Sequence, residues 1–193
     1  MRGHKDACFL SERTDWETPQ DLFDALDKEF KFNLDVCANA DNTKCDRFYA
    51  RVPRPFWEQP QGPGNPRPKQ IKAWLARIRV FRRLGIVCDS LAQDWQGNCW
   101  MNPPYGRAVQ DWVHKAVNTV RRSGRVLVCL MKSTTDTQWW HRYVWDTRGH
   151  TVRPGVSVRF LRGRLKFGDS AASAPFPSVI VIFEGRKMRT PVK

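Results

Sequence analysis

The sequence predicts an α/β fold, in which helices flank a central sheet of apolar strands. Short apolar runs of strand type alternate along the chain with amphipathic segments of helical period. The length of 193 residues allows one sizeable hydrophobic core. A content of 41% hydrophobic and 12% aromatic residues excludes a wholly disordered chain. We therefore expect a single domain over residues 1–193, with a flexible N-terminus at 1–14.

The first helix is predicted from Pro19 to about Phe30. Thr18 is the expected N-cap, Pro19 takes the first helical position, and Asp21 places a negative charge in the first turn. One face of this helix carries the apolar residues Leu22, Phe23, Leu26 and Phe30. A short strand is expected at 32–36.

The segment 51–85 interrupts this alternation. Six of the thirteen prolines lie between Pro53 and Pro68, which predicts a loop of polyproline character. From Lys69 to Leu84, apolar residues recur at helical spacing and cations fall largely on the other faces. We therefore expect an insertion made of a proline-rich loop and a basic helix.

Strands and helices alternate again after the insertion. The expected strands are 86–88, 99–101, 126–131 and 178–183, and the expected helices are 109–120 and 137–145. A hairpin is predicted over 156–167, with its turn at Arg162-Gly163. Residues 184–193 are expected to form a basic tail.

The chain carries a net charge of +14, and the charge is unevenly distributed. Residues 1–58 have a net charge of −3, residues 59–88 of +7 and residues 89–193 of +10. Such basic blocks predict a polyanionic partner; the alternative is a basic surface that only keeps the protein soluble.

The cysteines and the N-terminus indicate a cytoplasmic protein without a metal. The six cysteines include no Cys-x-x-Cys pair, so neither a zinc site nor a disulfide framework is expected. No apolar run approaches the ~20 residues of a membrane helix. The N-terminus lacks the apolar core of a signal peptide, so we expect a reducing, cytoplasmic compartment.

The tetrapeptide Asn102-Pro103-Pro104-Tyr105 directly follows the expected strand 99–101. Its two prolines fix two φ angles and remove two amide donors, so backbone carbonyls there face outward. Asn102 Oδ1 and the Pro103 carbonyl would then form a rigid cup of two acceptors, with the Tyr105 ring as a stacking platform. Such a cup suits a planar group that bears an exocyclic amine; the alternative is an ordinary turn.

Asn-Pro-Pro-Tyr is also the catalytic tetrapeptide of amino-methyltransferases that modify adenine N6 or cytosine N4. Over about 150 of its 193 residues the chain resembles one such family, the phage DNA N6-adenine methyltransferases of the Dam type. The segments that carry this resemblance are Trp16-Glu17-Thr18-Pro19-x-x-Leu22-Phe23, Phe32-x-Leu34-Asp35-Val36, Asn42-x-Lys44-Cys45, Asp89-Ser90-Leu91-x-x-Asp94-Trp95, Trp112-Val113-x-Lys115-Ala116 and Gly163-Arg164-Leu165-Lys166-Phe167.

The resemblance implies a Rossmann-like methyltransferase fold with a mostly parallel sheet, S-adenosylmethionine as methyl donor, and transfer to the N6 amine of a flipped adenine in DNA. It also implies that Asn102 and the Pro103 carbonyl accept hydrogen bonds from the amine, that Tyr105 stacks on the base, and that no metal takes part. Two alternatives are cytosine-N4 methylation and a catalytically degenerate DNA-binding module. The second stays open because the segment after Asp35 lacks the glycines of a standard donor loop.

Contacts to the methyl donor are expected at four residues. Thr18 and Pro19 resemble the helix start that meets the methionine end of the donor. Asp35 ends a short strand, where doubly wound folds bind ligands, and it suits the methionyl amine or the ribose. Asp89 suits the adenine amine of the donor, and Asp41 is a weaker candidate for the ribose. Asp35 and Asp89 could alternatively cap their own turns.

Contacts to DNA phosphates are expected on the insertion helix and on the predicted hairpin; a solvated basic surface is the alternative. The side chains concerned are Lys72, Arg79, Arg82, Arg83, Arg162, Arg164 and Lys166. The pair Trp139-Trp140 is interpreted as core packing rather than as a platform for bases.

Overall fold

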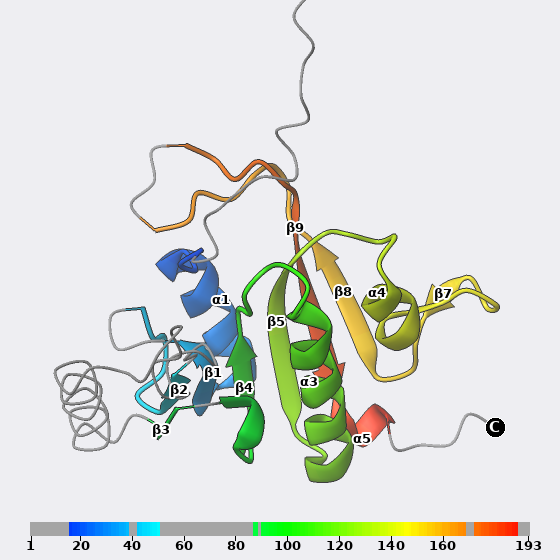
Figure 1. The fold of residues 1–193 in the computed structure, drawn as a ribbon, viewed down its shortest axis with the longest axis horizontal. Coiled ribbons are helices and arrows are strands. Elements are labelled where there is room, and N and C mark those ends of the chain that lie inside the picture. Colours follow the sequence, from blue (N-terminus) through cyan, green and yellow to red (C-terminus); the bar gives the residue numbers. More distant parts are fainter. Residues whose placement is uncertain (1–15, 39–41, 51–86, 89, 169–171, 189–193) are drawn as a thin grey trace, which may run out of the picture.

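The computed structural model describes residues 16–38, 42–50, 87–88, 90–168 and 172–188 (Figure 1). Several predictions lie outside these residues: the expected N-terminal segment 1–14, the whole insertion 51–85, and the side chains of Asp41, Lys72, Arg79, Arg82, Arg83 and Asp89. In the described part of the chain, seven strands form one sheet in the order β3-β2-β1-β4-β5-β9-β8.

Five strands of this sheet run parallel to one another. They are β1 (Leu34–Ala38), β2 (Phe48–Ala50), β3 (Val87–Cys88), β4 (Cys99–Met101) and β5 (Val126–Lys132). β9 (Ser178–Glu184) lies antiparallel between β5 and β8 (Val156–Phe160). The prediction of a mostly parallel, Rossmann-like α/β sheet is thus confirmed.

The strand order reverses between β1 and β4, which lie next to each other in parallel register. Leu34 is opposite Cys99, and Asp35 is opposite Trp100. In a doubly wound sheet, a ligand binds outside the carboxyl ends of the strands at such a switch point. The topology therefore directs attention to the residues that end β1 and follow β4.

Helices cover both faces of the sheet (Figure 1). α3 (Val109–Ser123) and α4 (Gln138–Tyr143) bury their apolar sides on one face. α1 (Gln20–Phe30) covers the other face, together with apolar side chains of the segment 161–176. The smaller elements are η2 (Ser90–Ala92), β6 (Trp145–Asp146), β7 (Thr151–Val152) and α5 (Gly185–Met188), the last inside the expected basic tail.

The predicted hairpin over 156–167 is wrong. Its first half is β8, but β8 pairs with β9 and not with the residues that follow Arg162. The chain does turn at Gly163, where φ is 79°, and it then continues as a loop. β9 is the better partner because six of its seven residues are buried, whereas Arg164 and Lys166 are exposed.

The capping prediction at the first helix is also wrong. α1 begins at Gln20 with Pro19 in the N-cap position, and no side chain of the described residues caps it. The Phe23 amide donates to the Pro19 carbonyl at 3.1 Å, so Thr18 lies one residue too early. The strand after α1 starts two residues later than expected, since Lys31 at φ 51° ends the helix and Asp27 binds the Phe32 amide.

Candidate active site

Asn102 directly follows β4, so it lies at the carboxyl edge of the sheet beside the switch point. Its amide nitrogen Nδ2 is 2.5 Å from the carbonyl oxygen of Trp16 and 3.1 Å from Oγ1 of Thr18. These two contacts use both N–H protons of the amide. A backbone carbonyl can only accept, so the contact with Trp16 determines which end of the Asn102 amide is nitrogen.

The other end of the amide, Oδ1, lies 3.1 Å from the hydroxyl of Tyr105. The same hydroxyl is 3.4 Å from the carbonyl of Leu130. Burial raises the pKa of Tyr105 well above its ordinary value, so the hydroxyl keeps its proton and acts as a donor at neutral pH. A carbonyl oxygen accepts two hydrogen bonds, and Oδ1 therefore retains capacity for a further donor.

Aromatic rings surround this polar centre. The ring centroid of Trp16 is 5.2 Å from that of Phe167 and 5.1 Å from that of Phe176, both in edge-on contact. Tyr105 also meets Phe176 edge-on, at 5.4 Å. The ammonium of Lys132 lies over the rings of Phe176 and Tyr105, at 4.2 and 5.3 Å from their centroids. Together these rings provide apolar contact for a planar heteroaromatic group beside Asn102.

Asp35 is the second residue of β1, the strand next to β4, so the prediction that it ends this strand is wrong. Its side chain is only 3% exposed. Its Oδ1 accepts from the Cys37 amide at 3.1 Å, and its Oδ2 accepts from the Lys44 amide at 3.2 Å. Burial raises the pKa of Asp35 to about 6, although these hydrogen bonds and the Lys44 ammonium act to lower it. The carboxylate therefore ties residue 37 to residue 44, the two sides of the segment that follows β1.

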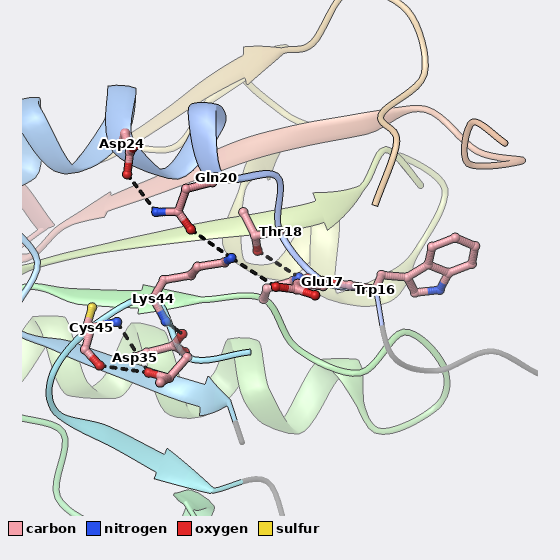
Figure 2. Close-up of polar contacts among 10 residues, drawn as sticks. Trp16, Glu17, Thr18, Gln20, Asp24, Asp35, Lys44 and Cys45 are labelled. Atoms are coloured by element: carbon pink, nitrogen blue, oxygen red, sulfur yellow. Dashed lines mark hydrogen bonds and ion pairs between the residues drawn. The ribbon is translucent and has the colours of Figure 1, made fainter. Parts of the chain in front are cut away.

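Lys44 connects Asp35 to the residues that hold Asn102 (Figure 2). Its Nζ lies 3.2 Å from Glu17 Oε1 and 3.0 Å from Gln20 Oε1, and its side chain is 8% exposed. The Glu17 carbonyl in turn accepts from the Gly168 amide at 3.0 Å. We call residues 16–18 the N-terminal strap, because contacts from three separate parts of the chain hold it.

Of the residues expected to contact DNA, those that the structure describes lie in the loop after β8. β8 runs parallel to β5, since both are antiparallel to β9, so this loop leaves the sheet at the same edge as Asn102. Phe160, the last residue of β8, is 66% exposed. Arg159 is engaged by Glu29 at 2.6 Å. The loop itself presents three exposed cations at this edge: Arg162, Arg164 and Lys166.

Sequence reasoning missed the contacts of several residues that shape the site. Trp16, Glu17 and Lys44 all stand in segments that carried the family resemblance, so the motifs indicated the right segments without indicating a role. Nothing in the sequence pointed to Lys132. Trp139 and Trp140, each 4% exposed, are confirmed as core residues. Among the described residues there is no cluster suited to a metal ion and no helix that could cross a membrane.

Comparison with curated proteins agrees with the motifs. The family model described as DNA N-6-adenine-methyltransferase (Dam) matches residues 7–56 and 82–191. The unmatched stretch between them, 57–81, falls within the predicted insertion. A DNA N-6-adenine-methyltransferase of Haemophilus phage HP1 (strain HP1c1) is 24% identical over 177 residues, which covers 90% of this chain and 80% of the relative.

Solved structures with a similar fold are more distant in sequence. A dimethyladenosine transferase from Plasmodium falciparum is 10% identical with a TM-score of 0.44; the match covers 88% of this chain and 62% of that one. A human methyltransferase 10 domain containing protein is 9% identical with a TM-score of 0.41, over 86% of this chain and 80% of that one. The family model, by contrast, covers most of the sequence, and the chain belongs to the DNA N-6-adenine-methyltransferase (Dam) family.

Proposed function

We propose that the protein methylates DNA by transferring the methyl group of S-adenosylmethionine to the N6 amine of an adenine turned out of the helix. The observation that carries this proposal is the orientation of the Asn102 amide. Both of its N–H protons are bound by the N-terminal strap, so the group available to a substrate is the carbonyl oxygen Oδ1. A base amine donates protons, and an oriented acceptor is what it requires.

The described residues fit a cationic methyl donor at the switch point. Each oxygen of Asp35 accepts one backbone amide and keeps lone pairs for the ammonium or the ribose of the donor. Thr18 and Pro19 precede α1 next to Asn102, and Asp89 completes the proposed donor set. Bound S-adenosylmethionine would supply a methyl group on a sulfonium: a neutral thioether would leave as the bond to N6 forms, and one proton of N6 would pass to water.

The protein's own part in the reaction is to make the amine reactive and to position it. Adenine N6 is a weak nucleophile because its lone pair is delocalised into the ring. Hydrogen bonds from the amine to Asn102 Oδ1 and to the Pro103 carbonyl stabilise the positive charge that develops on N6. Pro104 keeps this turn rigid, and the Tyr105 ring stacks on the flipped base, so that positioning supplies much of the rate.

We propose duplex DNA as the partner, held by Arg162, Arg164 and Lys166 at the edge that carries Asn102. This substrate places the reaction in the cytoplasm, that of the host bacterium if the chain is phage-encoded. Changing the three cations to Gln should weaken binding to all DNA sequences alike. It should also lower the slope of log affinity against log salt by roughly 1 for each phosphate that the variant no longer neutralises.

The matched control for this DNA experiment changes Arg121, Arg122 and Arg125 to Gln. These side chains are equally exposed, but they lie at the end of α3 and at the start of β5, on the opposite edge of the sheet. The control removes the same charge and should keep most of the salt slope. Equal effects of the two triple variants would indicate a general charge effect and contradict a DNA surface on the loop after β8.

Methyl transfer itself is tested with radiolabelled S-adenosylmethionine and unmodified DNA, followed by digestion to nucleosides. Label in N6-methyladenine supports the proposed function. Label in N4-methylcytosine contradicts it and supports methylation of cytosine. If no label is transferred and calorimetry detects no donor binding, the chain is a degenerate DNA-binding module instead.

A further inference from the structure

We propose that Thr18 is a positioning residue for methyl transfer: its hydroxyl oxygen holds the Asn102 amide so that Oδ1 faces the target amine. The inference rests on the proposed function and deepens it. It places Thr18 on the target side of the site, whereas the family resemblance implied a contact with the methionine end of the donor.

Among the described residues, Thr18 is the only one whose side chain accepts a hydrogen bond from the Asn102 nitrogen. Nδ2 has two acceptors there, the main-chain carbonyl of Trp16 at 2.5 Å and Thr18 Oγ1 at 3.1 Å. Thr18 is 4% exposed, and its side chain does not cap α1. A buried threonine at a helix start usually serves as a cap; here the hydroxyl is directed to Asn102 instead.

The consequence follows from the symmetry of an amide. Rotation by half a turn about the last side-chain bond of Asn102 exchanges Oδ1 and Nδ2 with little change in shape. In the rotated state an N–H group would face the amine of the base, and two donors would meet. The Trp16 carbonyl opposes this rotation, because it can only accept and would then face an oxygen. The Thr18 hydroxyl fixes the plane of the amide from a second point, at 3.1 Å. Thr18 thereby holds the amide in the position in which the Trp16 contact keeps Oδ1 toward the target amine.

The N-terminal strap is held firmly enough for this task. The carbonyl of Glu17 accepts the Gly168 amide at 3.0 Å, and the carboxylate of Glu17 binds the Lys44 ammonium at 3.2 Å. Both contacts act on the residue between Trp16 and Thr18. The two acceptors of the Asn102 nitrogen are therefore fixed to the body of the domain from two directions.

The decisive variant is Thr18→Val, which keeps the shape of the side chain and removes the acceptor. We expect kcat to fall ~10- to 100-fold, as small misplacements of a catalytic group do. Affinities for S-adenosylmethionine and for DNA should stay near the parental values. Thr18→Ser keeps the acceptor and should keep most of kcat. The matched control is Thr119→Val in α3, where an equally buried hydroxyl has no hydrogen-bond partner in the described part of the chain, and it should change nothing.

A second measurement does not depend on activity. The side-chain NH2 signals of Asn102 are assigned in ¹⁵N-labelled protein by their loss in Asn102→Ala. They should shift in Thr18→Val and stay nearly unchanged in Thr18→Ser and Thr119→Val. Circular dichroism of Thr18→Val shows whether the variant folds. If it does not fold, Thr18→Ser tests the proposal: it should keep most of kcat and leave the NH2 signals of Asn102 nearly unchanged.

Three results would overturn the assignment of Thr18. They are an unchanged kcat in Thr18→Val, unmoved NH2 signals of Asn102, or a loss confined to donor affinity, which would return Thr18 to the donor site. A parental protein that transfers no methyl group to adenine contradicts the proposed function alone, because the NH2 signals still test the contact between Thr18 and Asn102.

Discussion

Asn102 directly follows β4 and Asp35 lies in the neighbouring parallel strand β1, but the two side chains are held in opposite ways. The nitrogen of Asn102 is bound by residues 84 and 86 positions away in the sequence. The carboxylate of Asp35 is bound by amides only 2 and 9 positions away. The proposed target side, at Asn102, is therefore held by tertiary contacts, whereas the proposed donor side, at Asp35, is held by residues near it in the sequence.

The contacts of Asp35 also differ from those of a glycine-rich donor loop. A glycine-rich donor loop turns its amides toward the ligand. In this chain the carboxylate of Asp35 accepts two amides of the segment itself, those of Cys37 and Lys44. Asp35 thus ties Cys37 to Lys44, and any contact with the donor comes in addition to that task. The following predictions test how independent the two sides are.

The largest effect is expected for Asn102→Ala. Loss of one preorganised acceptor lowers the rate of methyl transfer ~10²- to 10³-fold, about 3–4 kcal/mol. Donor binding, measured by calorimetry, should be nearly unchanged because Asn102 faces the target side. Asn118→Ala on α3 is the control, since that amide binds His114, far along the helix from the tetrapeptide. More than half of the parental rate in Asn102→Ala would refute the acceptor model.

The next effect is a pH dependence of stability caused by Asp35. Its pKa of about 6 in the folded protein lies above the ordinary 3.8, so the folded state holds the proton more tightly than the unfolded state. The stability that this group contributes is greatest below pH 4 and is lost as the pH rises to 6, by about 3 kcal/mol at most. The free energy of unfolding is measured in urea for the parent and for Asp35→Asn, which cannot titrate. Between pH 4 and pH 6 the stability of the parent should fall relative to that of the variant. An identical pH dependence of the unfolding free energy in the two proteins would contradict the raised pKa of Asp35.

Donor affinity of the same Asp35→Asn variant tests the second task of this residue. Loss of a charge-assisted hydrogen bond should weaken S-adenosylmethionine binding by about 1.5–3 kcal/mol, with DNA binding unchanged. An unchanged donor affinity would leave Asp35 with the support of the turn alone. Residues other than Asp35 would then bind S-adenosylmethionine.

The smallest effect is expected for Tyr105→Phe, which keeps the ring and removes the hydroxyl that donates to Asn102 Oδ1. The rate should fall ~2- to 10-fold, about 0.5–1.5 kcal/mol, because the nitrogen end of the amide is still held. Tyr49→Phe, which removes a hydroxyl bound to the Asp94 carbonyl, is the control. A loss as large as that of Asn102→Ala would mean that the hydroxyl itself orients the base.

The sequence predicted best those features that depend on neighbouring residues. The helix at 20–30 and the strands at 99–101, 126–132 and 178–184 have apolar periods that local pattern reveals. The strand β2, Phe48–Ala50, was not predicted. The hairpin failed because the partner of a strand depends on the order of the whole sheet.

The predictions for the candidate site also divide into those based on neighbouring residues and those that would have required knowledge of distant contacts. The tetrapeptide was predicted because its chemistry is contiguous. Asp35 was predicted because it was expected to end a strand, whereas it is the second residue of β1. Thr18 was assigned to the helix cap, since a local rule explains a threonine there and nothing local points to a residue 84 positions away. Tertiary contact with Asn102 prevailed over the capping preference because the buried amide nitrogen needs its acceptors.

The place of β9 in the sheet has a consequence for how the protein is made. It comes last along the chain among the described strands, yet it lies inside the sheet and joins β5 to β8. While the ribosome is still adding the final part of the chain, β5 and β8 have emerged with open hydrogen-bonding edges and no partner between them. Such edges pair readily with other chains. A chain that stops before Ser178 should therefore aggregate rather than form a smaller enzyme, and the carboxyl edge with Asn102 is completed only when synthesis has passed Glu184.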